Sequence, residues 1–565
     1  MKHDKHAVST LASKASRALG WNFGSTALTK LGGLGISIML ARLLGPHVFG
    51  AYAVALVALV AMQNFNELGM SIAIVRWETD PRDIVPTVTT VSVLVSILTY
   101  VACYSIAPAY AAAMGAPSAT DVVRVLALAI IIDGFCNTPS GLLQRHFQQG
   151  KATIAAQAGN WTGIGLTVAL ALAHYGAMSL AVGQVAGALV VAVLLVVFAP
   201  ESLRFGFDPA KARALLRFGL PLSGSSLIDF AINSADQVIV GHQLGATTLA
   251  FYVLAFNLST WPLNMFSPAV KNVAPAVFSR LQHDQPTLRT TFVSAARILT
   301  AVTLPMCLFI GGSATPLVGL LYGGRWLPAA QPLMWLALAG GARIFMGLAY
   351  DYLAVRALTR LVLIIQVVWL IALIPCLMWA TRADGIYGTG LAEAAVVCMV
   401  VLPCYLAALH KADIGLMALG KSLLRPLTAA AGAGLCAIGA SSIMPGDLMT
   451  LALSGTITVL LIGMVAYRMR STFAQLRGVQ TQREDAAAPA KAQAGSGAEN
   501  RGRAPSQRTV RRSSSADPRP GQRGRHGVDS TPTRWRPAWR LGGITSTQIS
   551  DEDRQTETGD RARQA

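Results

Sequence analysis

The chain has 565 residues, of which 53% are hydrophobic and only 13% are charged, with a formal net charge of +19. A soluble domain carries about 25% charged residues, so this composition excludes an ordinary soluble protein. Apolar runs long enough to cross a bilayer, about 20 residues each, recur from Trp21 to Tyr467. We therefore predict an all-α polytopic membrane protein.

In chain order, residues 1–17 form a polar, basic leader, and the apolar run after it is too long for the core of a cleavable signal peptide. The apolar runs predict about fourteen transmembrane helices. Six fall in residues 18–200, six in 201–410 and two in 411–470. Residues 471–565 hold 17 Lys/Arg and 10 Asp/Glu and few large aliphatics, so we expect a disordered basic tail.

The arginines of the predicted tail suit either nucleic acid or anionic lipid headgroups. We favour a solvated tail beside the cytoplasmic leaflet and expect no nucleic-acid partner. With the N-terminus in the cytoplasm, fifteen Lys/Arg lie in predicted inner loops and three, Arg42, Arg325 and Arg382, in outer ones. Cytoplasmic loops carry such an excess, so we predict that both termini are cytoplasmic.

The first part of the chain is repeated. Residues 16–60 align without a gap on residues 216–260. Identical pairs include Leu44 and Leu244, Gly45 and Gly245, and Tyr52 and Tyr252. The offset equals six predicted helices and preserves membrane orientation, so we predict two six-helix lobes. Such repeats are typical of transporters, in which a cavity between lobes opens alternately to each side.

Charged residues occur within or near several predicted helices, although each costs about 2.5–3.5 kcal/mol at a helix centre. We interpret them as a polar cavity in which cations meet an anionic substrate and carboxylates balance the charge or bind a coupling ion. The alternative is local ion pairs, or side chains that reach the interface from helix ends. The residues are Lys30, Glu67, Asp133, Asp229, Asp236, Lys271, Arg297, Arg343, Asp351 and Glu393.

The two interpretations carry different weight at different positions. For Lys30, midway along the first predicted helix, we favour a place in the cavity. For Glu67, Arg297 and Asp351 we favour local pairs, and for Asp229 and Asp236 both interpretations stay open. The seven cysteines lie in apolar stretches without a C-x-x-C pair, so we expect no disulfide framework, metal site or cofactor.

One octet, "GLMALGKS" at residues 415–422, fits the written pattern of an ATP-binding P-loop. A P-loop needs a strand before its glycines and an α/β domain around it. Here the octet lies in a short polar link between predicted membrane helices, so we interpret the match as chance and expect no ATP binding.

A membrane glycosyltransferase is the rival enzyme reading, because "WETDPRD" at residues 77–83 offers a carboxylate pair. Enzymes of that kind, and polysaccharide polymerases and ligases, generally carry a large outer loop or domain. The predicted outer loops here are short, so we predict that the chain is not an enzyme.

Three segments carry a resemblance to a known family. Residues 40–76, "LARLLGPHVFGAYAVALVALVAMQNFNELGMSIAIVR", resemble the second-helix signature of Wzx-like polysaccharide flippases, a branch of the multidrug/oligosaccharidyl-lipid/polysaccharide exporter superfamily. "SADQVIVGHQLGATTLAFYVLAFNL" and "LLYGGRWLPAAQPLMWLALAGG" are similar to that family's seventh-to-eighth and ninth-to-tenth helix segments. With the repeat, the resemblance covers about residues 15–470.

The resemblance implies a flippase of the bacterial plasma (inner) membrane that moves an undecaprenyl-pyrophosphate-linked oligosaccharide during surface polysaccharide biosynthesis. Other polysaccharide-assembly proteins are candidate partners, together with membrane lipids. The alternative is an ion-coupled small-molecule exporter of the same superfamily. By region, the resemblance implies four cations that receive the pyrophosphate, namely Lys30, Arg42, Lys271 and Arg343. Candidate coupling or charge-balancing carboxylates are Glu67, Asp133, Asp229 and Asp236.

Overall fold

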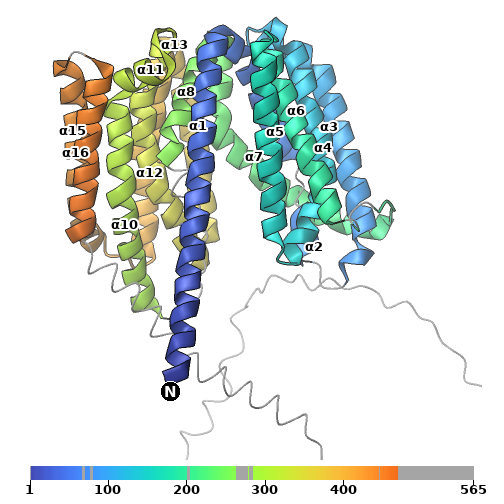
Figure 1. Ribbon diagram of the computed structural model, residues 1–565, viewed down its shortest axis with the longest axis horizontal. Helices are drawn as coiled ribbons and strands as arrows, with labels where there is room; N and C mark the ends of the chain where they lie inside the picture. Colours follow the sequence, from blue (N-terminus) through green and yellow to red (C-terminus); the bar gives the residue numbers. More distant parts are fainter. Residues whose placement is uncertain are drawn as a thin grey trace, which may run out of the picture. The chain divides into compact units, whose positions relative to one another are not determined.

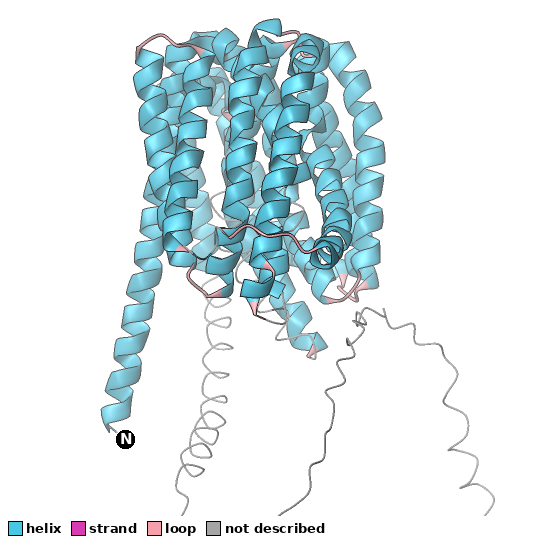
Figure 2. Cartoon of the chain, turned by 90° about the vertical axis from the view of Figure 1, so that its right-hand side faces the viewer, coloured by secondary structure: helices cyan, strands magenta, loops and turns pink. Residues whose placement is uncertain are grey.

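The computed structural model describes residues 2–66, 70–76, 80–199, 201, 204–262, 278, 284–444 and 446–468, and in these residues every regular element is a helix. Figure 2 shows the helices running roughly alongside one another, with short loops at the two ends of the bundle. The predicted all-α membrane class is confirmed. The predicted tail, residues 471–565, lies outside the described residues.

The first-lobe helices are α1 (Lys2–Asn66), α2 (Met70–Arg76), α3 (Val85–Ala113), α4 (Thr120–Arg145), α5 (Gln149–Leu172) and α6 (Ala177–Phe198). The following helices are α7 (Pro209–Leu244), α8 (Ala246–Ser259), α10 (Gln285–Gly312), α11 (Ala314–Tyr322), α12 (Ala330–Val355), α13 (Thr359–Val396), α14 (Leu402–Lys411), α15 (Leu416–Ile443) and α16 (Asp447–Arg468). Short 3-10 turns η1 (Pro81–Asp83), η2 (Pro117–Ala119) and η4 (Gly324–Ala329) and the π-helical turn η5 (Val397–Val401) connect some of them.

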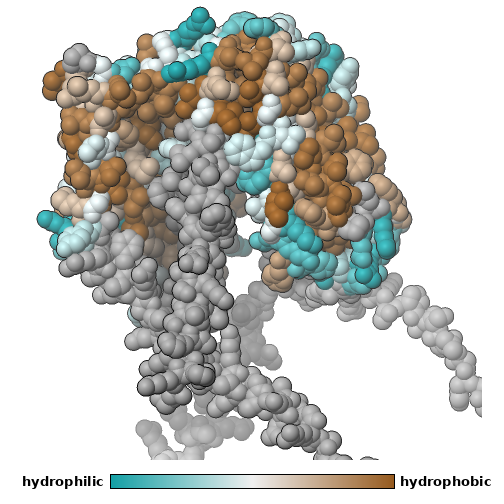
Figure 3. All heavy atoms as spheres, in the orientation of Figure 1, coloured by the Kyte–Doolittle hydropathy of each residue, from teal (hydrophilic) through white to brown (hydrophobic). Residues whose placement is uncertain are grey.

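Eight helical segments of the described chain are long and apolar enough to cross a membrane, judged by length and composition. On the face shown in Figure 3, hydrophobic side chains form a broad band across the described helices, with hydrophilic side chains above and below it. The chain is thus a multi-pass membrane protein. The count of fourteen spans and the lobe boundaries stay predictions.

Two of the long helices each contain a reversal. In α1, Gly45 has a left-handed φ of 73° and ψ of 170° and precedes Pro46, so two helices meet there. Gly245, its partner in the repeat, has φ of 83° and ψ of 172° between α7 and α8. Only glycine adopts this backbone region readily. The matching conformations agree with the predicted repeat. In α13 the break falls at Asp384 and Gly385.

α7 connects the two halves of the bundle. Its first turns carry Ala212 and Leu215, which are buried against Met70, Ile74 and Ile84 of the first lobe. Its later turns pack on α8 and α13, and Figure 1 shows it running between the two groups of helices. Predicted as the first helix of the second lobe, α7 therefore contacts both lobes.

The extra pair α15 and α16 packs against α10. A Cβ added at Gly312 of α10 would lie 2.8 Å from the carbonyl oxygen of Gly434 in α15. α15 also contains most of the P-loop-like octet, because it begins at Leu416 and continues beyond Ser422. Gly420 is thus inside a helix, and the octet does not form the loop that binds phosphate.

α5 and α6 meet through facing small residues. Gly159 and Gly163 of α5 lie against Gly183 and Gly187 of α6, and a Cβ at Gly163 would lie 2.8 Å from the Gly183 carbonyl oxygen. Small residues four apart let membrane helices approach closely enough for van der Waals packing. This contact holds the outer pair of the first lobe together.

We expect Gly163→Leu to lower the melting temperature of the purified protein, because its side chain would collide with the α6 backbone and cost about 1–3 kcal/mol. Fluorescence-detected size exclusion after heating would measure it. Gly165→Leu is the matched control, since no atom lies within 4 Å of a Cβ at Gly165. Equal stability of the two variants would contradict the contact.

Candidate functional site

Four of the eight predicted site residues have described side chains, namely Arg42, Asp133, Asp236 and Arg343. Lys271 and Glu67 lie outside the described residues, and Lys30 and Asp229 lie in α1 and α7 with side chains that are not described. Their assignment stays a prediction. The structure brings Asp236 and Arg343 together and places Arg42 and Asp133 elsewhere.

Arg42 joins the two lobes. Its Nε donates a hydrogen bond of 2.7 Å to the carbonyl oxygen of Leu321, and its Nη2 donates to that of Leu320. These carbonyls belong to the last turn of α11, where the helix dipole favours a cation. The guanidinium therefore caps a second-lobe helix from the first lobe. A role in binding substrate stays a prediction for Arg42.

Trp326 forms the next contact between the lobes. Its indole is 1% exposed and Nε1 donates a 3.1 Å hydrogen bond to the carbonyl oxygen of Ala41 in α1. Its ring packs edge-on against Phe49 and Phe251, with centroids 5.6 and 5.9 Å away. One aromatic partner thus comes from each lobe.

Gly50 is a close backbone contact between the lobes. A Cβ at this position would lie 2.4 Å from the carbonyl oxygen of Ala246, the first residue of α8. Gly50 follows the Gly45 turn and Ala246 follows the equivalent Gly245 turn, so the two repeats meet at corresponding positions. We call the contacts of Arg42, Gly50 and Trp326 the interlobe contact.

Asp133 belongs to a polar network inside the first lobe. Its Oδ2 accepts a 2.7 Å hydrogen bond from Nε2 of Gln63. One turn away, Ser96 Oγ donates to Asn66 Oδ1 at 2.8 Å, and a Cβ at Gly134 would collide with Ser96. The network links α1, α3 and α4. Our candidate list included Asp133 but not its partner Gln63.

A charge cluster lies in the second lobe and consists of Asp236, Tyr252, Arg343 and Glu393. Arg343 Nη2 forms an ion pair with Glu393 Oε1, and the two side chains are 12% and 1% exposed. Tyr252 donates a 2.8 Å hydrogen bond to Asp236 Oδ2, and both residues are buried. Ala235 and Ile239, on either side of Asp236 in α7, pack against the core that contains Ala392 and Ala394. Asp236 therefore lies near Glu393 and interacts electrostatically with it and with Arg343. The four residues come from α7, α8, α12 and α13.

The candidate list missed two members of the charge cluster. Glu393 was among the charges expected in the membrane but was not chosen for the site, although a buried arginine requires a carboxylate partner. In the sequence, Tyr252 was noted only because it aligns with Tyr52 in the repeat. Its hydroxyl could not be assigned a partner before α7 and α8 were placed side by side.

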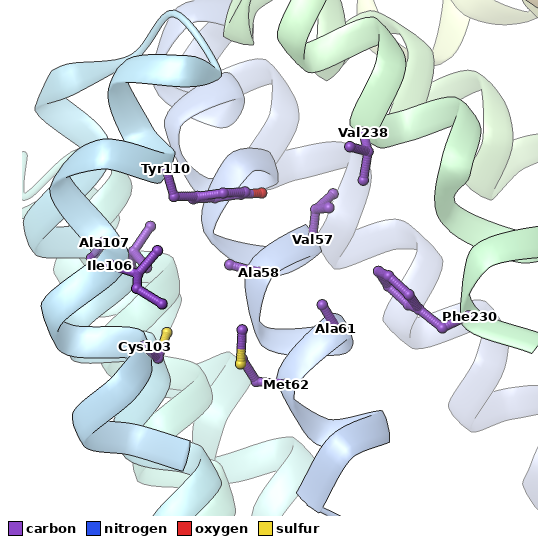
Figure 4. A pocket seen from close by; sticks show the side chains of 11 residues that line it. Val57, Ala58, Ala61, Met62, Cys103, Ile106, Ala107, Tyr110, Phe230 and Val238 are labelled. Carbon is purple, nitrogen blue, oxygen red and sulfur yellow. The ribbon is translucent and has the colours of Figure 1, made fainter. Parts of the chain in front are cut away.

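An apolar pocket of about 140 Å³ lies between α1, α3, α4 and α7. Figure 4 shows Met62, Cys103 and Tyr110 on one side and Phe230 and Val238 of α7 on another. The lining residues that the structure describes are all uncharged. An apolar surface of this kind suits a hydrocarbon chain.

Comparison with known proteins identifies the family of this chain. Residues 39–331, more than half of the chain, match the family described as "Polysaccharide biosynthesis protein". The chain belongs to this family. The resemblance to Wzx-like polysaccharide flippases that its sequence segments predicted is confirmed.

Two characterised relatives illustrate the family. The chain is 26% identical over 334 residues to the "Succinoglycan biosynthesis transport protein ExoT" of Rhizobium meliloti (strain 1021), covering 58% of this chain and 67% of that protein. It is 23% identical over 312 residues to the "Lipopolysaccharide biosynthesis protein WzxC" of Escherichia coli (strain K12), covering 54% and 63%. Both relatives carry polysaccharide biosynthesis in their names.

Solved structures share the fold. A lipid II flippase, MurJ, in an inward closed conformation matches 80% of this chain and 99% of its own with a TM-score of 0.65 and 12% identity. An inward-facing multidrug resistance MATE transporter matches 70% and 96% with a TM-score of 0.53 and 17% identity. At such identities the likeness shows a common architecture alone.

We expect Arg343→Met to lower stability strongly, by about 3–5 kcal/mol, because it leaves a buried carboxylate without its counterion. The double variant Arg343→Met/Glu393→Met should recover part of the loss, since apolar side chains of similar volume replace a buried pair well, whereas Asp236 still lacks a counterion. Melting temperatures in detergent would measure both.

Arg124→Met is the control for this prediction. Arg124 pairs with Asp121 at 3.7 Å, but the Asp121 side chain is 78% exposed, so little stability should be lost. A double variant as unstable as Arg343→Met would show that the ion pair is not what Arg343 contributes.

Proposed function

We propose that the chain is a flippase that moves a polyprenyl-pyrophosphate-linked oligosaccharide across the bacterial plasma membrane by alternating access. The observation that carries the proposal is a two-lobed helical bundle, joined at one end by the interlobe contact, in a member of the polysaccharide biosynthesis family. The named roles of the relatives and the fold shared with a lipid II flippase support it.

The chemistry of such a substrate requires this kind of protein. A diphosphate with sugars attached is too polar to enter hydrocarbon, where an uncompensated charge costs many kcal/mol. The prenyl chain has no such barrier and can stay in lipid. A polar path between two lobes, open to the membrane at its side, would carry the head while the chain remains outside.

The proposed orientation puts both termini in the cytoplasm, so that the first helix of α1 ends at the outer side. The interlobe contact near Gly45 would then be the outer gate, and the conformation would be closed to the outside. Opening this gate must break the hydrogen bonds of Arg42 to α11. Its guanidinium would then be free for an anionic group on its way out.

Four cations are the proposed partners of the diphosphate head, Lys30, Lys271, Arg343 and Arg42. Among them, Arg343 is bound to Glu393 in this conformation and could reach the substrate only after that ion pair rearranges. Lys30 is the first choice for mutation because its position is midway along the first predicted helix. The carboxylates Glu67, Asp133, Asp229 and Asp236 would balance the charge or bind a coupling ion.

A small-molecule exporter is the second candidate. The apolar pocket at Met62 and Phe230 would suit an aromatic cation, and Asp133 lies on α4, one of the helices that line this pocket. The fold shared with a multidrug transporter is compatible with this alternative. The compound that accumulates in cells lacking the chain distinguishes the flippase from the small-molecule exporter.

The first test is made on cells that lack the chain. Their lipid extract should contain a complete polyprenyl-pyrophosphate oligosaccharide that wild type clears and Lys30→Ala does not, as measured by mass spectrometry. Clearance by both proteins would keep the function and remove Lys30 from the site. A deletion strain without accumulation, and without a redundant flippase, would favour the exporter.

The outer gate is tested at Gly50. We expect Gly50→Leu to insert and fold but to abolish clearance, because its side chain would hold the α1 and α8 backbones apart. The variant should label faster with a membrane-impermeant maleimide at a cysteine placed at Val57, applied from outside in an otherwise cysteine-free protein. Gly165→Leu is the control, and unchanged labelling of Gly50→Leu would contradict the gate.

A further inference from the structure

The charge cluster has one more acid than base. Among the described residues it contains two carboxylates, Asp236 and Glu393, and one guanidinium, Arg343. Asp236 and Glu393 are each 1% exposed, so water does not solvate them. The Arg343 guanidinium lies over the Trp369 ring, 5.3 Å from its centroid, and the ring covers this face of the guanidinium.

The hydrogen bonds leave one oxygen free. Asp236 Oδ1 accepts from the backbone N–H of Gln237 at 2.8 Å, and Oδ2 accepts from Tyr252. Glu393 Oε1 binds Arg343, but Glu393 Oε2 is buried and has no hydrogen-bond partner in the described part of the chain. A buried carboxylate oxygen without a donor is costly.

A buried excess negative charge is removed most cheaply by binding a cation. Burying an isolated carboxylate costs so much that the group takes up a proton instead. A multivalent metal ion would need several anionic or neutral ligands around it. No group of three or more acidic, histidine or cysteine side chains able to hold a metal occurs in the described residues. Arg343 also occupies the place beside Glu393.

We propose that the charge cluster is a proton site, with one proton held by the carboxylates of Asp236 and Glu393. A proton from solvent adds to one carboxylate oxygen, and no other covalent bond changes. The buried cluster then has two single charges of opposite sign. In the described part of the chain, the other titratable groups in electrostatic contact with these carboxylates are Arg343, Tyr252 and the thiol of Cys376.

The position of the cluster connects it to the gate. Asp236 lies in α7, which contacts both lobes, and Tyr252 lies in α8, six residues after Ala246 of the interlobe contact. Loss of the proton would free Asp236 to compete with Glu393 for Arg343 and so shift α7 against α12 and α13. That the proton drives transport rests on the proposed function, whereas the site itself does not.

Infrared spectroscopy of the purified full chain in lipid nanodiscs tests the site. Wild type at neutral pH should show the carbonyl stretch of a protonated carboxyl group, shifted in D₂O. Asp236→Asn and Glu393→Gln should each lose the band, because the remaining carboxylate pairs with Arg343. Asp121→Asn, an exposed acid, should keep it.

Tyr252→Phe provides a second variant that removes a hydroxyl and little volume. It should retain the band at a shifted frequency, since the hydrogen bond to Asp236 is lost. A wild-type spectrum whose protonated-carboxyl band survives unchanged in both Asp236→Asn and Glu393→Gln would overturn the site. The absence of any such band in wild type would do the same.

The link to transport is tested separately in the deletion strain. Asp236→Asn, expressed at the wild-type level, should fail to clear the lipid-linked saccharide, and clearance equal to wild type would overturn coupling through this site. A normal wild-type band in a chain whose deletion causes no accumulation would refute the proposed function and leave the proton site standing.

Discussion

Hydrocarbon offers no hydrogen bonds, so every polar group inside this bundle must find its partner in the protein. That constraint explains why all regular elements described are helices and why the hydroxyls of Thr89 and Thr303 donate to carbonyls one turn back in their own helices. It also explains why buried charges occur together. Burying Arg343 or Asp236 alone would cost too much free energy, so four helices bring their polar side chains together in the charge cluster.

The same constraint separates the roles of the charged residues. Arg42 is exposed and donates to the carbonyls at the end of α11, so its bonds can be exchanged with water or a ligand at modest cost. Arg343 is almost buried and its partner fully so, which makes rearrangement there expensive without a compensating cation. Arg42 therefore suits a gate that opens and closes, whereas Arg343 suits a site that changes only when a cation binds.

The internal repeat relates the position of the interlobe contact to that of the charge cluster. The turns at Gly45 and Gly245 place Gly50 against Ala246, so at this point the lobes meet through backbone, beside the side-chain contacts of Arg42 and Trp326. A contact of this kind is either closed or open, because packed backbone has little room for intermediate distances. α7 runs from the first lobe to the charge cluster and can transmit a change at one place to the other.

The sequence by itself determined the membrane class, the helical content, the repeat and the family, because hydropathy and glycine turns are local properties of the chain. It also predicted charged residues within or near the membrane helices. Only the tertiary structure decided their partners. Arg42 meets α11 across 279 residues and Arg343 meets Glu393 across 50, and such pairings depend on which helix faces pack together. Hydropathy records how apolar a helix is, but not which neighbour its polar side chains will meet.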